Sequence, residues 1–244
     1  GGAMLDNKET TKNYFKGLTR KDYIERVCKI MEKDGAEDLS IRRIAKELGC
    51  SSAALYRYFN SKSELMYYVS LNTLEGYIIR LNQVEKNWRG VWDIYVGVWY
   101  CYSQEAFRHP KDYNRLFFEH TNEYLGGAMK EFYQMFPQNI NEANQFFSET
   151  LGTADFWGRD FEMCKKCMKA GAISEENALI LNRMSCILYK GYFKGVMDDG
   201  IEEDEIEERV HSFIDDLDII VKALASELQG YDGYFKQKRE KNDK

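Results

Sequence analysis

Proline is almost absent from this chain, and that scarcity limits what the chain can fold into. The 244 residues include only two prolines, Pro110 and Pro137. Because proline interrupts an α-helix and is confined to the edges of sheets, long helices are permitted and an all-β fold is disfavoured. The 44% hydrophobic content is enough to bury a sizeable core in one small and one larger domain. The sequence therefore predicts an all-α protein.

The segment from residue 39 to residue 65 has the pattern of a helix-turn-helix. Ser40 is placed to cap a first helix, and Gly49 can end that helix with a positive φ. Ser51 or Ser52 then caps a second helix that we expect to run to about Phe59. The side chains expected to face outward from this second helix are Ser52, Ala53, Tyr56, Arg57 and Tyr58. A helix of this kind presents such side chains to the major groove of DNA.

Positive charge is concentrated in the same part of the chain. The whole sequence carries a net charge of −6. Residues 1–65 hold 13 basic and 10 acidic side chains, whereas the remaining residues hold 21 basic and 30 acidic ones. The first part would therefore attract DNA phosphates and the second part would be repelled by them.

These residues resemble the TetR (tetracycline-repressor) family of one-component bacterial regulators. The resemblance starts at the apolar face of the preceding helix and ends with the pattern Leu-Tyr-x-x-Phe-x-x-Lys-x-x-Leu. Its residues are Ile24, Val27, Cys28, Ile30, Met31, Gly35, Leu39, Ser40, Arg42, Ile44, Ala45, Leu48, Gly49, Leu55, Tyr56, Phe59, Lys62 and Leu65. The resemblance implies an N-terminal three-helix DNA-binding domain and a larger C-terminal helical domain for ligand binding and dimerisation. It also implies a dimer that binds palindromic, double-stranded operator DNA.

The resemblance also implies roles for individual residues. Arg42 matches a position that can reach a base edge, where its guanidinium suits guanine O6 and N7. Tyr56, Tyr58 and Lys62 match positions that hold phosphates, and Ser40 could both cap its helix and contact a phosphate. Arg57 has the reach for either a base or the backbone. Ser52 and Ala53 face the groove region.

We expect four stretches along the chain. Residues 1–19 comprise an expression scar, Gly-Gly-Ala before Met4, and a mobile arm; residues 20–66 form the DNA-binding domain; residues 67–230 form the effector-binding and dimerisation domain; residues 231–244 are a charged tail. A single helix from Ser61 to about Val84, opened by a Ser61–Glu64 capping box, is expected to connect the two domains.

Further helices are predicted over residues 88–108, 111–124, 128–136, 142–170, 174–198 and 203–228, with stops at Gly126-Gly127 and Gly171. Apolar residues surround the first of these, which is expected to lie centrally. The last two carry apolar stripes, and Gly191 and Gly195 lie one turn apart in the helix over 174–198. The resemblance implies that helices 174–198 and 203–228 form the homodimer interface. An antiparallel pair within one subunit remains an alternative.

Aromatic residues are dense in the second domain, where the resemblance implies a small-molecule effector of hydrophobic or aromatic character. The candidate effector-binding residues are Trp92, Tyr95, Trp99, Phe117, His120, Phe156 and Trp157, with Arg159 opposite the central helix. Ordinary core packing is the alternative for several of these side chains.

The predicted function is that of a ligand-released repressor, and two other classes of function are alternatives to it. An enzyme is disfavoured because the sequence has only one Glu-x-x-His pair, Glu208 and His211, where a carboxylate-bridged metal centre needs two. A glycine-rich phosphate loop and a nucleophile elbow are missing, so no catalytic residue, cofactor or metal is expected. A thiol- or metal-responsive regulator would use Cys164 and Cys167, a lone Cys-x-x-Cys. No stretch approaches the roughly 18 apolar residues of a membrane span, so we expect a cytoplasmic protein with no membrane partner.

Overall fold

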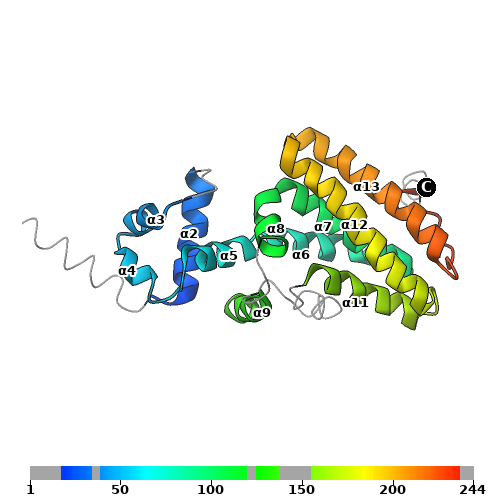
Figure 1. Ribbon diagram of the computed structural model, residues 1–244, viewed down its shortest axis with the longest axis horizontal. Helices are drawn as coiled ribbons and strands as arrows, with labels where there is room; N and C mark the ends of the chain where they lie inside the picture. Colours follow the sequence, from blue (N-terminus) through cyan, green and yellow to red (C-terminus); the bar gives the residue numbers. More distant parts are fainter. Residues whose placement is uncertain (1–17, 35–38, 120–124, 138–154, 237–244) are drawn as a thin grey trace, which may run out of the picture. The chain divides into compact units, whose positions relative to one another are not determined.

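The computed structural model describes residues 18–34, 39–119, 125–137 and 155–236. Helices and turns make up the regular structure of these residues (Figure 1). The chain divides into two compact units, residues Gly1–Asn72 and Thr73–Lys244, called here the N-terminal and C-terminal units. The all-α prediction is confirmed for the described residues.

The N-terminal unit is a small helical domain around a core of apolar side chains. Its helices are α2 (Arg20–Asp34), α3 (Ile41–Leu48), α4 (Ser52–Leu55) and α5 (Lys62–Leu71). Helix α2 packs against both α3 and α5, and α3 packs against α4. The core side chains include Tyr23, Ile24, Val27, Leu39, Ile44, Leu55, Phe59 and Leu65. This packing holds the two short helices at the fixed angle that a helix-turn-helix requires.

The predicted caps of the helix-turn-helix are present. The Ser40 hydroxyl accepts the Arg43 backbone N–H at 3.2 Å, and Gly49 ends α3 with a φ of 71°. Ser51, and not Ser52, caps α4 by accepting the Ala54 N–H at 3.2 Å. These side chains satisfy backbone groups that a helix end would otherwise leave without partners.

Helix α4 is shorter than predicted. It ends at Leu55, and the chain continues to Phe59 as a tight turn. The backbone N–H groups of Arg57 and Tyr58 bond to carbonyl oxygens three residues earlier, which is the spacing of a 3₁₀ turn. The predicted end at Phe59 is therefore wrong for the helix, although the chain remains coiled to that residue.

The prediction of one connecting helix from Ser61 to Val84 is also wrong. Helix α5 ends at Leu71, and α6 (Leu74–Val84) begins after a turn at residues 72–73. Asn72 donates its N–H to the carbonyl oxygens of both Ser70 and Val69, so the last turn of α5 tightens. Asparagine and threonine are poorer helix formers than leucine, which explains a break without proline or glycine.

The predicted capping box at the start of α5 is present only in part. The Ser61 hydroxyl accepts the Glu64 N–H at 3.0 Å, as expected. The Glu64 carboxylate, however, accepts the N–H of Asn60 and not that of Ser61. Glu64 also pairs with Arg20 of α2, so one carboxylate both caps α5 and links it to α2.

The C-terminal unit surrounds one buried helix with the others. Its elements are α6, the 3₁₀ helix η1 (Glu85–Asn87), α7 (Val91–Arg108), α8 (Pro110–Phe117), α9 (Leu125–Met135), α11 (Phe156–Lys169), α12 (Glu175–Asp199) and α13 (Glu203–Leu224). Helix α7 packs against α6, α8, α11, α12 and α13, and Figure 1 shows α12 and α13 lying side by side. Fourteen of its residues are buried, which confirms the prediction of a central helix.

Several predicted helix ends differ in this unit. Helix α8 stops at Phe117, and residues 120–124 of the predicted helix lie outside the described residues. Helix α9 starts at Leu125 and includes Gly126 and Gly127, which were predicted to be a stop. Glycine costs least in a first turn, where backbone N–H groups lack helical partners anyway. Residues 142–154 of the predicted helix over 142–170 are not described. Gly171, with a φ of 72°, follows the end of α11 as predicted.

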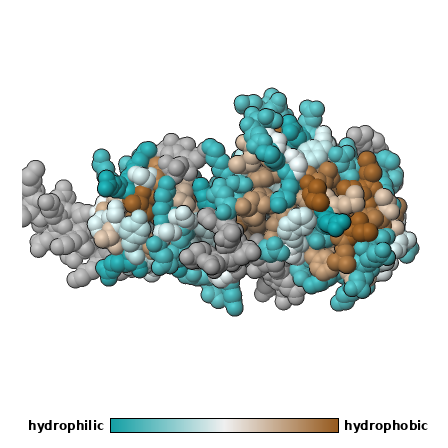
Figure 2. Space-filling model, in the orientation of Figure 1, coloured by the Kyte–Doolittle hydropathy of each residue, from teal (hydrophilic) through white to brown (hydrophobic). Residues whose placement is uncertain are grey.

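The apolar stripes of the last two helices face inward more than predicted. Leu181 and Val196 of α12, and Ile206, Val210, Phe213 and Leu217 of α13, are buried within the unit. The antiparallel pair within one subunit therefore accounts for these residues. A different set is exposed, namely Leu179, Ile180, Met184 and Ile187 of α12 and Ile219 of α13. Apolar residues are visible along the part of Figure 2 that α12 occupies in Figure 1.

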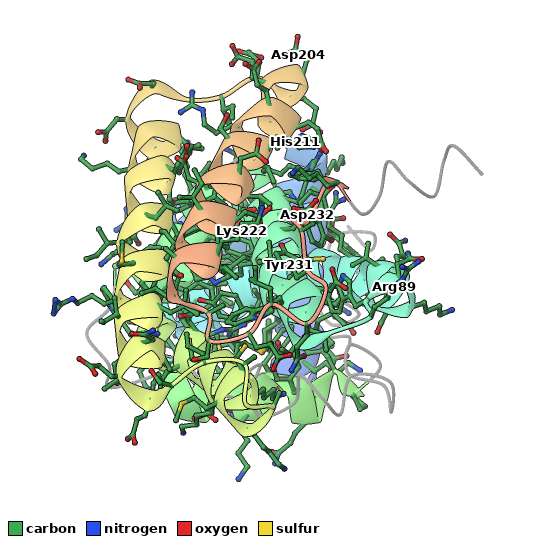
Figure 3. The ribbon with its side chains drawn as sticks, turned by 90° about the vertical axis from the view of Figure 1, so that its right-hand side faces the viewer. Arg89, Asp204, His211, Lys222, Tyr231 and Asp232 are labelled. Atoms are coloured by element: carbon green, nitrogen blue, oxygen red, sulfur yellow. The ribbon has the colours of Figure 1, made fainter. Side chains whose placement is uncertain are left out.

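The chain after α13 packs onto the unit and does not continue the helix to residue 228. Tyr231 donates its hydroxyl hydrogen to Asp218 of α13, and the Tyr234 N–H donates to the same carboxylate at 2.9 Å. Lys222 donates to the Asp232 carbonyl at 2.8 Å, and Figure 3 shows these residues together beside α13. Burial raises the pKa of Asp218. Residues 231–236, expected to belong to a charged tail, thus include buried tyrosines.

Gly97 allows α7 to approach the Trp88 side chain. A Cβ atom at position 97 would lie 2.4 Å from the Trp88 ring, too close for any substitution without movement. Gly97→Ala should therefore lower the free energy of unfolding by about 1 to 3 kcal/mol through overpacking. Urea unfolding monitored by circular dichroism measures this change.

Gly127→Ala is the matched control, because no atom lies within 4 Å of the added Cβ. Alanine there should be neutral or stabilising by up to about 1 kcal/mol. Equal stability of the two variants would contradict the proposed close contact.

Candidate functional site

The two short helices of the N-terminal unit present polar and basic side chains on one exposed surface. Arg42 and Lys46 of α3, Ala53 of α4, and Tyr56 and Arg57 of the following turn are exposed. Tyr56 is 49% exposed, so packing against α3 does not account for its side chain. Ile44, Ala45, Leu48, Leu55 and Phe59 lie on the opposite side and are buried. The sequence pattern thus separates the buried face from the exposed face as expected.

Ser40 is exposed and Ser52 is half-buried. The Ser40 hydroxyl oxygen already accepts the Arg43 N–H, but its hydrogen stays available to an acceptor such as a phosphate oxygen. Ser52 is the first residue of α4 and is half-buried. Both therefore lie where a bound backbone or base could reach them without a change in the fold.

Tyr58 contributes to the packing of its own unit. Its hydroxyl donates a hydrogen bond to the Leu18 carbonyl at 2.9 Å, and its ring centroid lies 4.9 Å from that of Tyr23. A phosphate oxygen needs a donor, and this donor is used. A phosphate contact by Tyr58 would therefore require the bond to Leu18 to break.

Lys62 is the first residue of α5 and is half-buried. The start of α5 is held in place by the ion pair of Arg20 with Glu64. The Arg20 guanidinium also lies 4.3 Å from the centroid of the Tyr68 ring and 5.0 Å from that of Phe59. A cation over aromatic rings in a partly buried position stabilises the contact between α2 and α5.

The C-terminal unit contains a cavity of about 30 Å³ beside α7. Its wall is formed by Tyr77 of α6, by Val98, Trp99 and Tyr102 of α7, and by Phe156, Arg159, Asp160 and Met163 of α11. Of the seven candidate effector-binding residues, Trp99 and Phe156 line this cavity. Their ring centroids are 5.9 Å apart.

The other candidates lie elsewhere or outside the described residues. Trp92 donates to the Glu227 carbonyl at 2.9 Å, and Tyr95 donates to the Ser185 hydroxyl at 2.9 Å. Phe117 lies behind the wall, with its ring 5.7 Å from that of Tyr102. Trp157 is next to Phe156 and faces Lys190. His120 is not among the described residues.

Sequence reasoning missed Tyr77, Tyr102 and Asp160 as wall residues and treated Arg159 only as a neighbour. Tyr102 lies one helical turn from Trp99, and this spacing could have placed both side chains on one face. Tyr77 belongs to α6, which was expected to be part of a connector. Its contribution could not be predicted without the packing of α6 on α7.

Asp160 is a buried carboxylate held by three donors. Trp99 Nε1 donates to it at 2.8 Å and Asn182 Nδ2 at 2.9 Å, while the Cys164 sulfur lies at 3.6 Å. Burial raises the pKa of Asp160 to about 6, and the donated hydrogen bonds limit that rise. Asp160 therefore anchors α11 to α7 and α12.

The buried cysteines lack the properties of a thiol sensor. Burial raises the pKa of Cys164 above its ordinary range and that of Cys167 to about 12. The thiolate is the reactive and metal-binding form, so these thiols are protonated at neutral pH. The described residues contain no group of three or more His, Cys, Asp or Glu side chains that could hold a metal ion. These observations do not favour a response through Cys164 and Cys167.

A search for membrane spans among the described helices found none that is both long enough and apolar enough to cross a bilayer.

Comparison with known proteins relates this chain to bacterial regulators. Residues 26–69 match the family model described as bacterial regulatory proteins, tetR family. Over 66 residues the chain is 36% identical to HTH-type transcriptional regulators from Staphylococcus aureus strains USA300 and NCTC 8325 / PS 47. Each match covers 27% of this chain and 36% of the relative, so the chain spans little more than a third of their length.

The comparison of structures reaches further along the chain. A protein with unknown function from Rhodococcus sp. RHA1 matches 87% of this chain and 98% of its own, with a TM-score of 0.53 and 18% sequence identity. This likeness shows that both units have a helical fold in common with a solved structure. It carries no information about ligands at that identity.

Asp160 should make the stability of the protein depend on pH. Its pKa is about 6 in the folded protein against an ordinary value of 3.8, so between these pH values the folded state binds more protons than the unfolded state. The free energy of unfolding contributed by this group therefore falls as the pH rises through that window. A difference of about two pKa units corresponds to about 3 kcal/mol.

Urea unfolding of the wild type and of Asp160→Asn at a series of pH values tests this. The free energy of unfolding of the wild type, relative to the variant, should decrease between about pH 4 and pH 7. A relative stability that does not change with pH would contradict the assignment.

Proposed function

We propose that this chain, whose residues 26–69 match the TetR family of bacterial regulatory proteins, is a ligand-released transcriptional repressor. As a dimer it binds a palindromic operator in double-stranded DNA. An effector bound in the C-terminal unit then lowers the affinity for that operator. The single observation that carries this proposal is the exposed, basic surface of α3, α4 and the turn to Phe59.

The exposed surface has the parts needed for reading a sequence. Arg42 extends from α3 next to the short α4, and its guanidinium can donate two hydrogen bonds to guanine. Arg57 lies at the end of the reading segment and can reach a base or a phosphate. Ala53 and Ser52 are small enough for close approach of the backbone to the groove. These residues therefore supply base contacts in our proposal.

Phosphate contacts would fix the position of the reader on the duplex. The Tyr56 ring is exposed, Lys62 is the first residue of α5, and the Ser40 hydroxyl retains a hydrogen for donation. Contacts of this kind carry little sequence information but give a large share of the affinity. Tyr58 is a weaker member of this group because its hydroxyl bonds to Leu18.

A dimer would place two readers on the operator. One reader buries too little surface for tight specific binding, whereas two can occupy half-sites roughly 34 to 36 Å apart. The outer face of α12 offers a surface for self-association, since Leu179, Met184 and Ile187 are exposed there. A Cβ atom added at Gly191 would meet no other atom within 4 Å. A Cβ atom added at Gly195 would lie 3.3 Å from a guanidinium nitrogen of Arg209 in α13. Gly191 is thus the better candidate for close approach of a partner.

Effector release requires a path from the C-terminal unit to the reader. Helix α6 begins two residues after the end of the N-terminal unit and contributes Tyr77 to the cavity wall. A ligand that displaces Tyr77 would move the helix that leads directly to the reader. In our proposal Trp99 and Phe156 contact the effector, Phe117 and Trp157 support them, and Trp92 and Tyr95 hold α7 in place.

Variants of the reader test the proposed DNA contacts. Arg42→Ala should lose about 1 to 3 kcal/mol of preference at one base pair of the operator. Lys62→Ala should weaken all sequences alike and flatten the salt dependence by about one unit. Both are measured on an operator selected from random DNA, on its single-base variants, and at several salt concentrations.

Lys165→Ala serves as the control, because Lys165 lies on α11 of the C-terminal unit and pairs with Glu162. It should leave binding unchanged. A uniform loss for Arg42→Ala on every sequence would remove its base-reading role, and failure to select any DNA would overturn the proposed function.

The dimer is tested by placing a charge on the exposed apolar face. Ile187 is 58% exposed, and Ile187→Glu should convert the dimer to a monomer at micromolar concentration because a carboxylate cannot be buried there unpaired. Sedimentation velocity measures the change. Ile79→Glu is the matched control, since Ile79 is 48% exposed on α6. If Ile187→Glu stays a dimer, the interface lies elsewhere.

A further inference from the structure

We propose that the effector is an organic anion with a flat apolar body, such as an aromatic carboxylate, bound by Arg159 and Tyr102. This inference rests on the proposed function, because it identifies the ligand class of the cavity in the C-terminal unit. The juxtaposition that carries it is a buried guanidinium and a buried phenol hydroxyl on the wall of one aromatic cavity.

Arg159 is a cation in an apolar environment. Its side chain is only 5% exposed and lines the cavity. The guanidinium lies 5.0 Å from the centroid of the Phe117 ring, and one of its nitrogens is 3.9 Å from the Met129 sulfur. Few waters can reach such a group, so an anion beside it would be attracted more strongly than at the protein surface. A guanidinium also has the planar donor geometry that matches a carboxylate.

The Tyr102 hydroxyl is a second donor on the same wall. Tyr102 is 5% exposed, and its hydroxyl lies near that of Tyr189, but neither makes a hydrogen bond of ordinary geometry to a described residue. Burial raises the pKa of Tyr102, and the Arg159 guanidinium acts against that rise. The hydroxyl is therefore protonated, within the field of the guanidinium, and able to donate to a ligand oxygen.

Tyr77 adds to the same electrostatic environment from α6. Burial raises the pKa of Tyr77 as well, and Arg159 again opposes the rise. Tyr77 and Tyr102, together with Arg159, thus bring polar groups and one positive charge from three helices to the cavity wall, and the Arg159 guanidinium is also hydrogen-bonded to Tyr77. An anionic group is the ligand chemistry that satisfies such donors.

Asp160 also lines the cavity but does not favour a cationic ligand. Its Oδ1 atom accepts from Trp99 at 2.8 Å, and its Oδ2 atom accepts from Asn182 at 2.9 Å. Both oxygens are therefore committed to holding the fold. Its raised pKa of about 6 leaves the carboxyl ionised at pH 7, so its repulsion of an anion falls only as the pH drops below 6.

The remaining wall suits a flat apolar body. Trp99 and Phe156 present aromatic rings whose centroids are 5.9 Å apart, and Met163 adds a flexible side chain. Aromatic faces and methionine sulfur pack well against a planar ring. The Arg159 guanidinium interacts electrostatically with both Tyr102 and Tyr77, so the ligand should carry its charge at the end that meets these three side chains.

The size of the cavity connects binding to a change in the protein. A volume of about 30 Å³ holds about two water molecules, which is too little for an aromatic ring. Binding must therefore displace wall side chains, including Tyr77 of α6. Helix α6 is linked to α7 by the ion pair of Arg80 with Glu105, and an added Cβ at Gly76 would contact Glu105. A larger cavity would strain this contact and move α6.

Calorimetric titration of the full chain, without DNA, tests the ligand class. A panel of aromatic carboxylates from benzoate to naphthoate is compared with the matching neutral amides and benzylamine. The carboxylates should bind about 10-fold to 150-fold more tightly than the amides, the range expected for a charged hydrogen bond. Arg159→Met should remove that preference, and Tyr102→Phe should weaken carboxylate binding about 2-fold to 10-fold.

Tyr113→Phe is the matched control, because its hydroxyl is equally buried and without a described partner but does not line the cavity. It should bind carboxylates as the wild type does. If Arg159→Met fails to fold, the loss of carboxylate affinity in Tyr102→Phe still tests the ligand class. Amides that bind as tightly as carboxylates, variants that bind unchanged, or a panel in which no carboxylate binds would each overturn the inference.

A separate measurement of operator binding distinguishes a wrong ligand class from a wrong mechanism of effector release. If carboxylates bind in the predicted order but leave operator affinity unchanged, the ligand class is right and effector release is wrong. If no carboxylate binds while the operator is still bound, the ligand class is wrong and DNA binding stands. Where release occurs, operator DNA must weaken ligand binding by the same factor as the ligand weakens DNA binding.

Discussion

The burial of most of α7 is the constraint on which the C-terminal unit depends. None of the residues of this helix is fully exposed, and five helices, α6, α8, α11, α12 and α13, pack against it. Trp99 stands at its middle and contacts the rings of Phe156, Tyr189 and Phe213 while its indole N–H bonds to Asp160. Buried aromatic rings with a satisfied polar atom contribute much of the packing energy of such a core. Trp99 also lines the cavity, so one side chain contributes both to the packing of the core and to the proposed ligand site.

In the N-terminal unit, contacts of one arginine side chain join two of the helices. Arg20 pairs with Glu64 and lies over the Tyr68 ring, which joins α2 to α5. Helices α3 and α4 are too short to be stable alone and depend on this framework and on their serine caps. Arg42, Ala53, Tyr56 and Arg57 are exposed on this surface, whereas Tyr58 is bonded to the Leu18 carbonyl. A reading surface can vary in sequence under these conditions without loss of the fold.

The apolar residues of the last two helices fall into a buried set and an exposed set. The inner faces of α12 and α13 pack within the subunit, while Leu179, Met184 and Ile187 remain exposed on the outer face of α12. Exposed apolar groups of this kind on a single helix face are typical of association sites. The stripe predicted from periodicity contained residues of both faces, because α12 is apolar over much of its circumference. The packing of α11, α13, α8 and α7 against α12 separates the two sets.

The sequence by itself determined the helical class, the cap at Ser40 and the helix end at Gly49, and the division of α3 and α4 into buried and exposed faces. These depend on local spacing and on hydrogen bonds between neighbouring residues. Tertiary structure decided the break between α5 and α6, the inward face of α13, and the cavity that joins Tyr77 to Arg159. Such features depend on contacts between segments far apart in the chain, and helical periodicity carries no information about which neighbour a face will meet.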